Sequence, residues 1–181
     1  MTDDVITRRY DRTFDLLDTN ANGLLEEKDF TGLAEKIAQA TGVCSSAKEE
    51  ALLREWRRCW RTLREHADTD SDGVISRDEF HRAMAGAYGD RTRIQELLAP
   101  GLEAEFAAMD GDDDGIATVE QFEAFLVAFG LEAEEARVAR TLLDADGDGR
   151  ITREEYLNGW TGFLLGEAGD GPAGGLLGPV S

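Results

Sequence analysis

Hydrophobic residues recur every three or four positions along most of the chain, and short polar stretches interrupt this pattern at intervals. Such spacing is typical of helices that bury one face. It predicts helices through residues 5–17, 30–40, 47–67, 80–89, 102–109, 122–130, 138–142 and 156–163, with a shorter one at 94–98. Pro100-Gly101 is expected to separate that short helix from the next. The pattern therefore predicts an all-α protein.

The polar stretches share one arrangement of oxygen-bearing side chains. They span residues 18–29, 68–79, 110–121 and 144–155. Each begins with aspartate and has glycine at place 6, and the last, from Asp144 to Glu155, also has acids at places 3, 5 and 12. Calcium takes about six to eight oxygen ligands, and glycine permits the sharp turn that brings them together. An acidic Asp-Gly turn is the alternative interpretation, but a match over twelve places favours a cation site.

The predicted ligands occupy places 1, 3, 5, 7 and 12 of each loop, with place 7 contributing its backbone carbonyl. They are Asp18, Asn20, Asn22, Leu24 and Asp29 in the first loop; Asp68, Asp70, Asp72, Val74 and Glu79 in the second; Asp110, Asp112, Asp114, Ile116 and Gln121 in the third; and Asp144, Asp146, Asp148, Arg150 and Glu155 in the fourth. The chain is therefore predicted to bind Ca²⁺.

The residue at place 12 ranks the loops. Glu79 and Glu155 can each give two carboxylate oxygens, so the second and fourth loops should bind most tightly. Asp29 is shorter, and a contracted site would suit Mg²⁺, which we expect to compete with Ca²⁺ in the first loop. Gln121 is neutral, so the third loop should bind weakly, and an empty third loop remains an alternative.

Hydrophobic residues at place 8 predict how the loops associate. Leu25 should lie opposite Ile75, and Ala117 opposite Ile151, in short two-residue β-contacts. These contacts would join the first loop to the second and the third to the fourth, so that filling one site helps to order its partner.

This pairing predicts an N-terminal pair of loops within residues 1–90 and a C-terminal pair within residues 91–165. Residues 166–181 are rich in glycine and are expected to form a flexible tail. The apolar residues Leu176 and Leu177 near its end could fold back into a groove.

Composition narrows the range of partners. The 181 residues carry 19 Lys and Arg against 38 Asp and Glu, for a formal charge of −19, which argues against nucleic acid and anionic membranes. A group of arginines on the helix at 47–67 could contact nucleic acid, but its acidic neighbours favour a solvated face. These are Arg54, Arg57, Arg58, Arg61 and Arg64. Trp56 and Trp60 on the same helix are predicted to be core residues.

Other features favour a soluble cytoplasmic protein without catalytic activity. Cys44 and Cys59 are expected to be reduced thiols. The N-terminus shows no basic leader with an apolar run, and no apolar stretch has membrane-spanning length. His66 and His81 are isolated, and no serine or cysteine has an evident base partner, so no enzyme is predicted.

Four loops in register, beginning at Asp18, Asp68, Asp110 and Asp144, resemble those of the EF-hand family. The gaps of 50, 42 and 34 residues between loop starts are similar to those of calerythrin and the sarcoplasmic calcium-binding proteins. The resemblance implies four EF-hand units in two paired lobes of a compact fold, and we expect a monomer.

The function implied is a cytosolic calcium buffer or modulator of intracellular calcium. The alternative is a calcium sensor that exposes an apolar groove to a target protein. Sensors of that kind use methionine-rich grooves, whereas this chain has three methionines, Met1, Met84 and Met109. The predicted core is instead rich in Phe and Trp, which favours the buffer.

Overall fold

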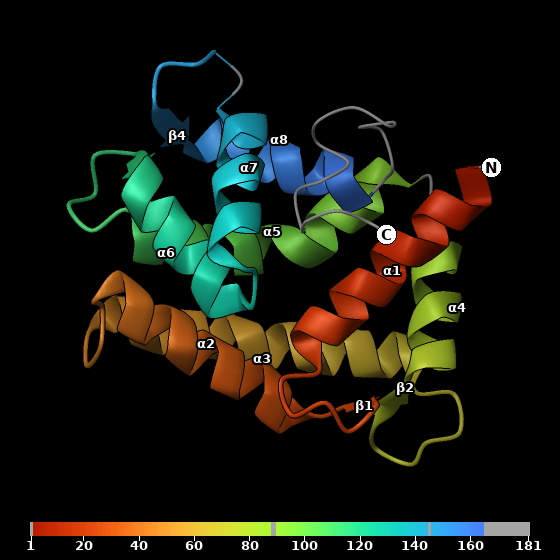
Figure 1. Cartoon of the computed structure of the whole chain (residues 1–181). Coiled ribbons are helices and arrows are strands. Elements are labelled where there is room, and N and C mark those ends of the chain that lie inside the picture. Colours follow the sequence, from red (N-terminus) through yellow and green to blue (C-terminus); the bar gives the residue numbers. More distant parts are fainter. Residues whose placement is uncertain (1, 88–89, 145, 165–181) are drawn as a thin grey trace.

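The computed structural model describes residues 2–87, 90–144 and 146–164. Within these ranges the chain forms eight α-helices and four short strands (Figure 1). In chain order they are α1 (Thr2–Leu17), β1 (Leu24–Leu25), α2 (Glu27–Thr41), α3 (Ala47–Ala67), β2 (Ile75–Ser76), α4 (Arg77–Ala87), α5 (Arg91–Met109), β3 (Ile116–Thr118), α6 (Val119–Phe129), α7 (Ala133–Leu143), β4 (Arg150–Thr152) and α8 (Arg153–Leu164). The predicted all-α fold of four helix-loop-helix units is confirmed.

The loops pair as the place 8 residues predict. Strands β1 and β2 are antiparallel, with Leu25 opposite Ile75, and the two strands lie together at one end of the molecule (Figure 1). Strands β3 and β4 are also antiparallel, with Ala117 opposite Ile151. This second contact has three residues on each strand, one more than predicted. Residues at place 8 are fully buried in both pairs, which fixes the register.

Helix α5 corrects one sequence prediction. It runs without interruption through Pro100, so the predicted break between a short helix at 94–98 and the next helix is wrong. A proline inside a helix removes only one backbone hydrogen bond, and packing against α3 and α8 stabilises the rest of the helix. Gly101 serves that packing, because a Cβ atom there would lie 3.0 Å from Cys59 Sγ of α3.

The two pairs of hands share a continuous hydrophobic core. Helix α3 packs along α5, and α2 packs along α6, so the helices of the N-terminal half lie directly against those of the C-terminal half (Figure 1). Aromatic rings continue across this boundary: the centroids of Trp56 and Phe129 are 6.1 Å apart, and those of Phe129 and Trp160 are 5.7 Å apart. Trp56 and Trp60 are buried, as predicted.

A boundary near residue 90 between an N-terminal and a C-terminal domain stays a prediction, and the shared core joins the two halves closely. The predicted flexible tail at 166–181, with Leu176 and Leu177, lies outside the described residues.

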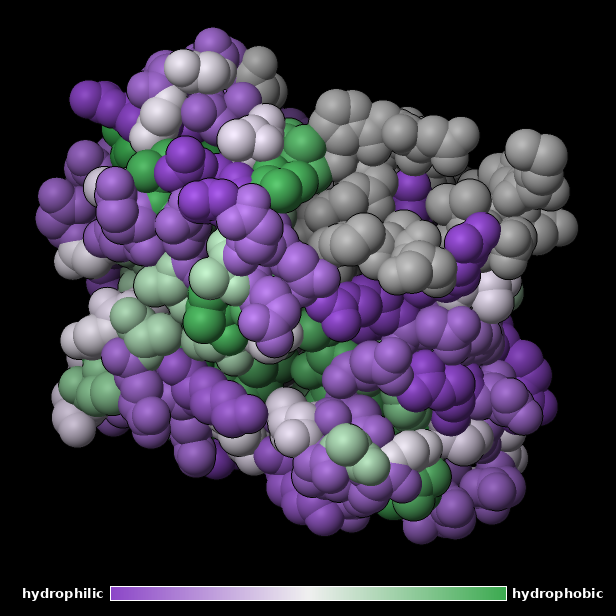
Figure 2. All heavy atoms as spheres, viewed as in Figure 1, coloured by the Kyte–Doolittle hydropathy of each residue, from purple (hydrophilic) through white to green (hydrophobic). Residues whose placement is uncertain are grey.

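Hydrophilic residues cover much of the face seen in Figure 2. Among the residues described, only Val127 and Val138 are large hydrophobic residues with exposed side chains. The five arginines of α3 are exposed, in keeping with a solvated face, and Glu55 forms ion pairs with Arg54 and Arg58. No helix in the described part of the chain is long and apolar enough to cross a membrane.

Candidate metal centre

All four loops coil in the same way. The glycine at place 6 has a left-handed backbone, with φ of +81° at Gly23, +90° at Gly73, +84° at Gly115 and +80° at Gly149. In each loop its N–H donates a hydrogen bond of 2.8–3.1 Å to the aspartate at place 1. This bond turns the chain back on itself, so that the oxygen atoms at the first places can converge.

The second and fourth loops gather the carboxylates that the sequence predicts. One oxygen from each of Asp68, Asp70 and Glu79 lies within 4.8 Å of the others, and Asp144, Asp146 and Glu155 form an equivalent group. Asp72 and Asp148 at place 5 accept hydrogen bonds from the N–H groups of the residues at place 7, Val74 and Arg150, at 3.0 and 2.8 Å. Three of the predicted side-chain ligands therefore meet in each loop, while place 5 shapes the backbone.

Glu79 is fixed by four hydrogen bonds. Its Oε2 accepts from the N–H and hydroxyl of Ser76 at 3.0 and 2.7 Å, and its Oε1 accepts from the N–H and hydroxyl of Thr69 at 2.9 Å each. These bonds, led by those from Ser76, lower the pKa of Glu79 to about 2, so the carboxylate is ionised at neutral pH. The second loop thus presents a fixed negative charge at place 12.

A buried oxygen without a hydrogen-bond partner also suits the second loop to a hard cation. Asp68 Oδ1 is buried and has no hydrogen-bond partner, although Asp70 and Glu79 lie beside it. A buried carboxylate oxygen without a partner is costly, and a bound cation would satisfy it. The residues present therefore suit Ca²⁺, which takes several oxygen ligands.

The fourth loop closes in a similar way. Glu155 Oε2 accepts hydrogen bonds from the N–H and hydroxyl of Thr152 at 2.9 and 2.8 Å. Serine or threonine at place 9 followed by an acid at place 12 is the pattern of a capping box, in which the two residues bond to each other's backbone at the start of a helix. Sequence reasoning missed this role of Ser76 and Thr152, although the S/T-x-x-E spacing signals it.

In the first loop, Asp29 accepts hydrogen bonds from three residues of the loop itself. Asp29 is fully buried, and its Oδ2 accepts from the Glu26 N–H at 3.0 Å. Its Oδ1 accepts from the Asn20 amide at 2.6 Å and from the Thr19 hydroxyl at 2.9 Å. Two predicted ligands, Asn20 and Asp29, are thus in direct contact, and a half-turn of the Asn20 amide would present its oxygen to a cation instead.

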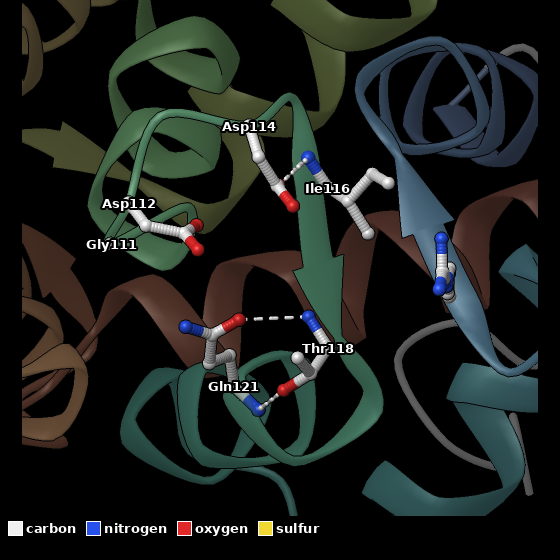
Figure 3. A pocket seen from close by; sticks show the side chains of 7 residues that line it. Gly111, Asp112, Asp114, Ile116, Thr118 and Gln121 are labelled. Atoms are coloured by element: carbon white, nitrogen blue, oxygen red, sulfur yellow. Dashed lines mark hydrogen bonds between the residues drawn. The ribbon is translucent and has the colours of Figure 1, made fainter.

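The third loop opens into a pocket of about 420 Å³ (Figure 3). Residues of the third loop and one residue of the fourth form its walls. They are Gly111, Asp112, Asp114, Ile116, Thr118, Gln121 and Arg150. The carboxylates of Asp110, Asp112 and Asp114 converge within 4.8 Å, so this loop gathers its acids without help from place 12.

Gln121 explains why place 12 does not join the acids of the third loop. Its Oε1 accepts a hydrogen bond from the Thr118 N–H at 2.8 Å, which leaves the amide nitrogen as the other polar atom of the side chain. Figure 3 shows the amide directed toward Asp112 across the pocket. Rotating the amide would place an NH₂ group against an N–H donor, so the oxygen is held at Thr118. An amide nitrogen cannot bind a cation, and the third loop therefore lacks a second closing oxygen.

The residues at place 7 lie where the strands begin. Leu24, Ile116 and Arg150 are the first residues of β1, β3 and β4, and Val74 directly precedes β2. Arg150 also lines the pocket of the neighbouring third loop, a position that its place in the fourth loop did not indicate.

Known proteins share these sequence and structural features. A family model for an EF-hand domain pair matches residues 9–85, and one for a single EF hand matches residues 142–159. A calcium-binding protein of Streptomyces coelicolor is 31% identical in sequence, with a TM-score of 0.81 over 88% of this chain and 98% of that protein. The chain belongs to the EF-hand family of calcium-binding proteins.

Two groups within the EF-hand family resemble this protein over nearly its whole length. Calerythrin of Saccharopolyspora erythraea is 28% identical over 169 residues, which cover 92% of this chain and 96% of calerythrin. A sarcoplasmic calcium-binding protein from amphioxus has the same fold, with a TM-score of 0.71 and 19% identity over 97% of each chain. The resemblance to these two groups is confirmed, and these relatives are calcium-binding proteins rather than enzymes.

Proposed function

We propose that this EF-hand protein is a calcium buffer or modulator of intracellular calcium, acting in the cytoplasm as a monomer. The predicted residues at places 1, 3, 5, 7 and 12 are the proposed ligands, except Gln121, whose oxygen is held by the Thr118 N–H. The second and fourth loops would be the tight sites, because each has a glutamate positioned beside two aspartates. The third loop would be the weakest, because Gln121 offers no charge.

A core closed by aromatic side chains supports the buffer most directly. Phe30, Trp56, Phe129 and Trp160 form a continuous series of ring contacts from one half to the other. A sensor must separate its helices to expose a groove, and methionines usually line that groove. Separating the helices here would break these contacts, and Met109 is itself buried.

Magnesium is proposed as a competitor in the first loop. Mg²⁺ requires a smaller shell of oxygens than Ca²⁺. The short Asp29 side chain and the direct contact between Asp29 and Asn20 support a contracted site of this kind.

A calcium sensor is the second candidate. The calcium-binding protein of Streptomyces coelicolor is described in the context of prokaryotic calcium-mediated regulation, and it is 31% identical to this chain. That relationship favours a regulatory role, which would require a surface that changes when calcium binds and a target protein that recognises it.

Calorimetric titration with calcium, repeated in millimolar magnesium, separates these two functions. A buffer should show tight sites with dissociation constants of roughly 10⁻⁸ to 10⁻⁶ M, competition by magnesium, and little added binding of a hydrophobic dye. A large, calcium-dependent rise in dye binding would instead indicate the sensor.

A variant in which both Glu79 and Glu155 are replaced by Gln is the control. It should lose the tight sites and any dye response that depends on them. Sedimentation of the calcium-loaded protein would test the proposed monomer, and a calcium-dependent increase in mass would contradict it.

A further inference from the structure

A lysine of the N-terminal half contacts the third loop. Lys48 lies in the first turn of α3, and its Nζ donates a hydrogen bond of 2.5 Å to the carbonyl oxygen of Asp110. The same nitrogen lies 2.8 Å from Asp113 Oδ1. The Lys48 side chain is 23% exposed, so this charge is partly shielded from solvent. A positive charge is therefore held beside a calcium loop of the other half.

The connection between α2 and α3 positions this lysine. Gly42 ends α2 with a left-handed backbone, at φ of +76°. Ser46 then caps α3 by accepting a hydrogen bond from the Glu49 N–H at 3.3 Å. Because α2 packs along α6, which follows the third loop, the beginning of α3 is brought close to that loop. The contact thus depends on how the two halves pack.

Lys48 binds groups that are not among the proposed ligands. Asp113 occupies place 4 and has a left-handed backbone, at φ of +60°. The other loops have Ala21, Ser71 and Gly147 at place 4, none of which carries a charge. The third loop therefore has an additional acid, and a lysine from a distant segment neutralises it. The converging carboxylates of Asp110, Asp112 and Asp114 remain available to a cation.

We propose that Lys48 determines the calcium affinity of the third loop and lowers it. This inference rests on the proposed function of the loop as a calcium site. The ammonium group repels an incoming divalent cation and cancels the attraction that Asp113 would otherwise exert. Solvent screens this opposition, because the Asp113 side chain is 75% exposed. We therefore expect about a five- to tenfold loss of affinity, as for an interaction between unit charges in a water-like dielectric. The N-terminal half thereby sets the calcium range of a C-terminal site.

Replacing Lys48 by Met tests the proposal, because Met is similar in length but uncharged. The readout is the amide resonance of each place 6 glycine during a calcium titration, followed together with calorimetry. The Gly115 N–H bonds Asp110 Oδ2 at 2.8 Å, so its resonance should report a cation at Asp110. In the Lys48→Met variant, Gly115 should respond at about five- to tenfold lower calcium, and Gly73 and Gly149 should respond as in the original protein.

Lys36→Met is the matched control. Lys36 is exposed on α2, so its replacement removes the same net charge from another part of the surface. It should leave the Gly115 titration unchanged. Lys48→Gln separates charge from hydrogen bonding, because glutamine can still donate to the Asp110 carbonyl. It should produce the same gain in affinity as Lys48→Met.

Three results would overturn the inference. The first is an unchanged Gly115 titration in both Lys48 variants. The second is a Gly115 response that requires more calcium in those variants, which would indicate a purely structural role. The third is an equal gain in the Lys36 variant. Asp113→Asn should weaken the third loop in the original protein and have a different effect once Lys48 is replaced, because the two charges interact. Failure of Gly73 and Gly149 to respond to calcium would instead contradict the proposed function itself.

Discussion

The two halves of the molecule each combine a loop closed by glutamate with a loop that departs from this pattern. In the N-terminal half, Asp29 keeps the carboxylate but is one methylene shorter, and the Asn20 amide donates a hydrogen bond of 2.6 Å to it. In the C-terminal half, Gln121 keeps the length but lacks the charge, and its oxygen is held by the Thr118 N–H. A contracted loop can compensate for length, whereas nothing else at place 12 can replace a carboxylate.

We expect the largest change in calcium affinity when the place 12 residue of the second loop is replaced by that of the third. Glu79→Gln removes the ionised group that Ser76 and Thr69 hold in position, while the capping hydrogen bond can persist. We expect about a hundredfold loss of calcium affinity in that loop, which corresponds to about 2.7 kcal/mol. Calorimetry should show one fewer tight site.

Glu50→Gln provides the control for this change, because Glu50 is exposed on α3 and distant in sequence from any loop. It removes the same charge and should leave the number of tight sites unchanged. Equal losses in the two variants would mean that overall charge, rather than the closing carboxylate, determines affinity.

The reverse exchange, Gln121→Glu in the third loop, should raise calcium affinity by less than Glu79→Gln lowers it. Gln121→Glu can keep the hydrogen bond from the Thr118 N–H with one oxygen and offer the second oxygen to the pocket, as Glu155 does beside Thr152. We expect about a thirtyfold increase in the affinity of the third loop, or about 2 kcal/mol. The gain should be smaller than the loss at Glu79, because Lys48 still opposes the cation. Calorimetry would detect the additional tight site, and an unchanged third loop would show that its backbone is not correctly arranged.

The halves also differ in their cores, because the C-terminal core contains a buried glutamate. This glutamate should make the free energy of unfolding depend on pH. Glu105 of α5 is buried and accepts a hydrogen bond from the Tyr156 hydroxyl of α8. Burial raises the pKa of Glu105 to about 8, despite the opposing effect of that bond. The other acids that are buried in the described residues, Asp18, Asp29, Glu79 and Asp110, belong to the loops. Within the described residues, Glu105 is thus the buried acid that lies outside the loops, in the C-terminal core.

The sign of this effect follows from linkage. Because the folded protein holds a proton on Glu105 that the unfolded chain releases above its ordinary pKa of about 4.5, the stabilising contribution is complete below that pH. It is lost as pH rises toward about 8. Glu105→Gln keeps an acceptor for Tyr156 without an ionisable group, so its free energy of unfolding should vary less between pH 5 and 8, by about 3 kcal/mol. Denaturant unfolding of both proteins across this range, with Glu65→Gln on the exposed face of α3 as the control, would measure the difference. Parallel pH profiles for the original protein and Glu105→Gln would contradict it.

Much of the site could be predicted because its determinants are local. A loop of twelve residues contains its own ligands and its own turn, and the same twelve-place pattern after Asp18, Asp68, Asp110 and Asp144 made each loop visible. The hydrophobic residue at place 8 likewise determined which loops pair, because a residue that must be buried on one face of a short strand fixes its register. Even the ranking of the loops by Glu79, Asp29 and Gln121 required no knowledge of tertiary contacts.

Other features were decided only when distant segments packed together. Helix α5 continues through Pro100 because its neighbours α3 and α8 stabilise it, although local signals favour a break. The contact of Lys48 with Asp110 and Asp113 depends on the packing of α2 against α6, since 62 residues separate Lys48 from Asp110 in sequence. The sequence by itself thus determined the number of helix-loop-helix units and predicted the ligand chemistry of their loops, because both arise from neighbouring residues. The tertiary structure decided which charges surround each loop and how the two halves join, because these depend on contacts between residues far apart in the chain.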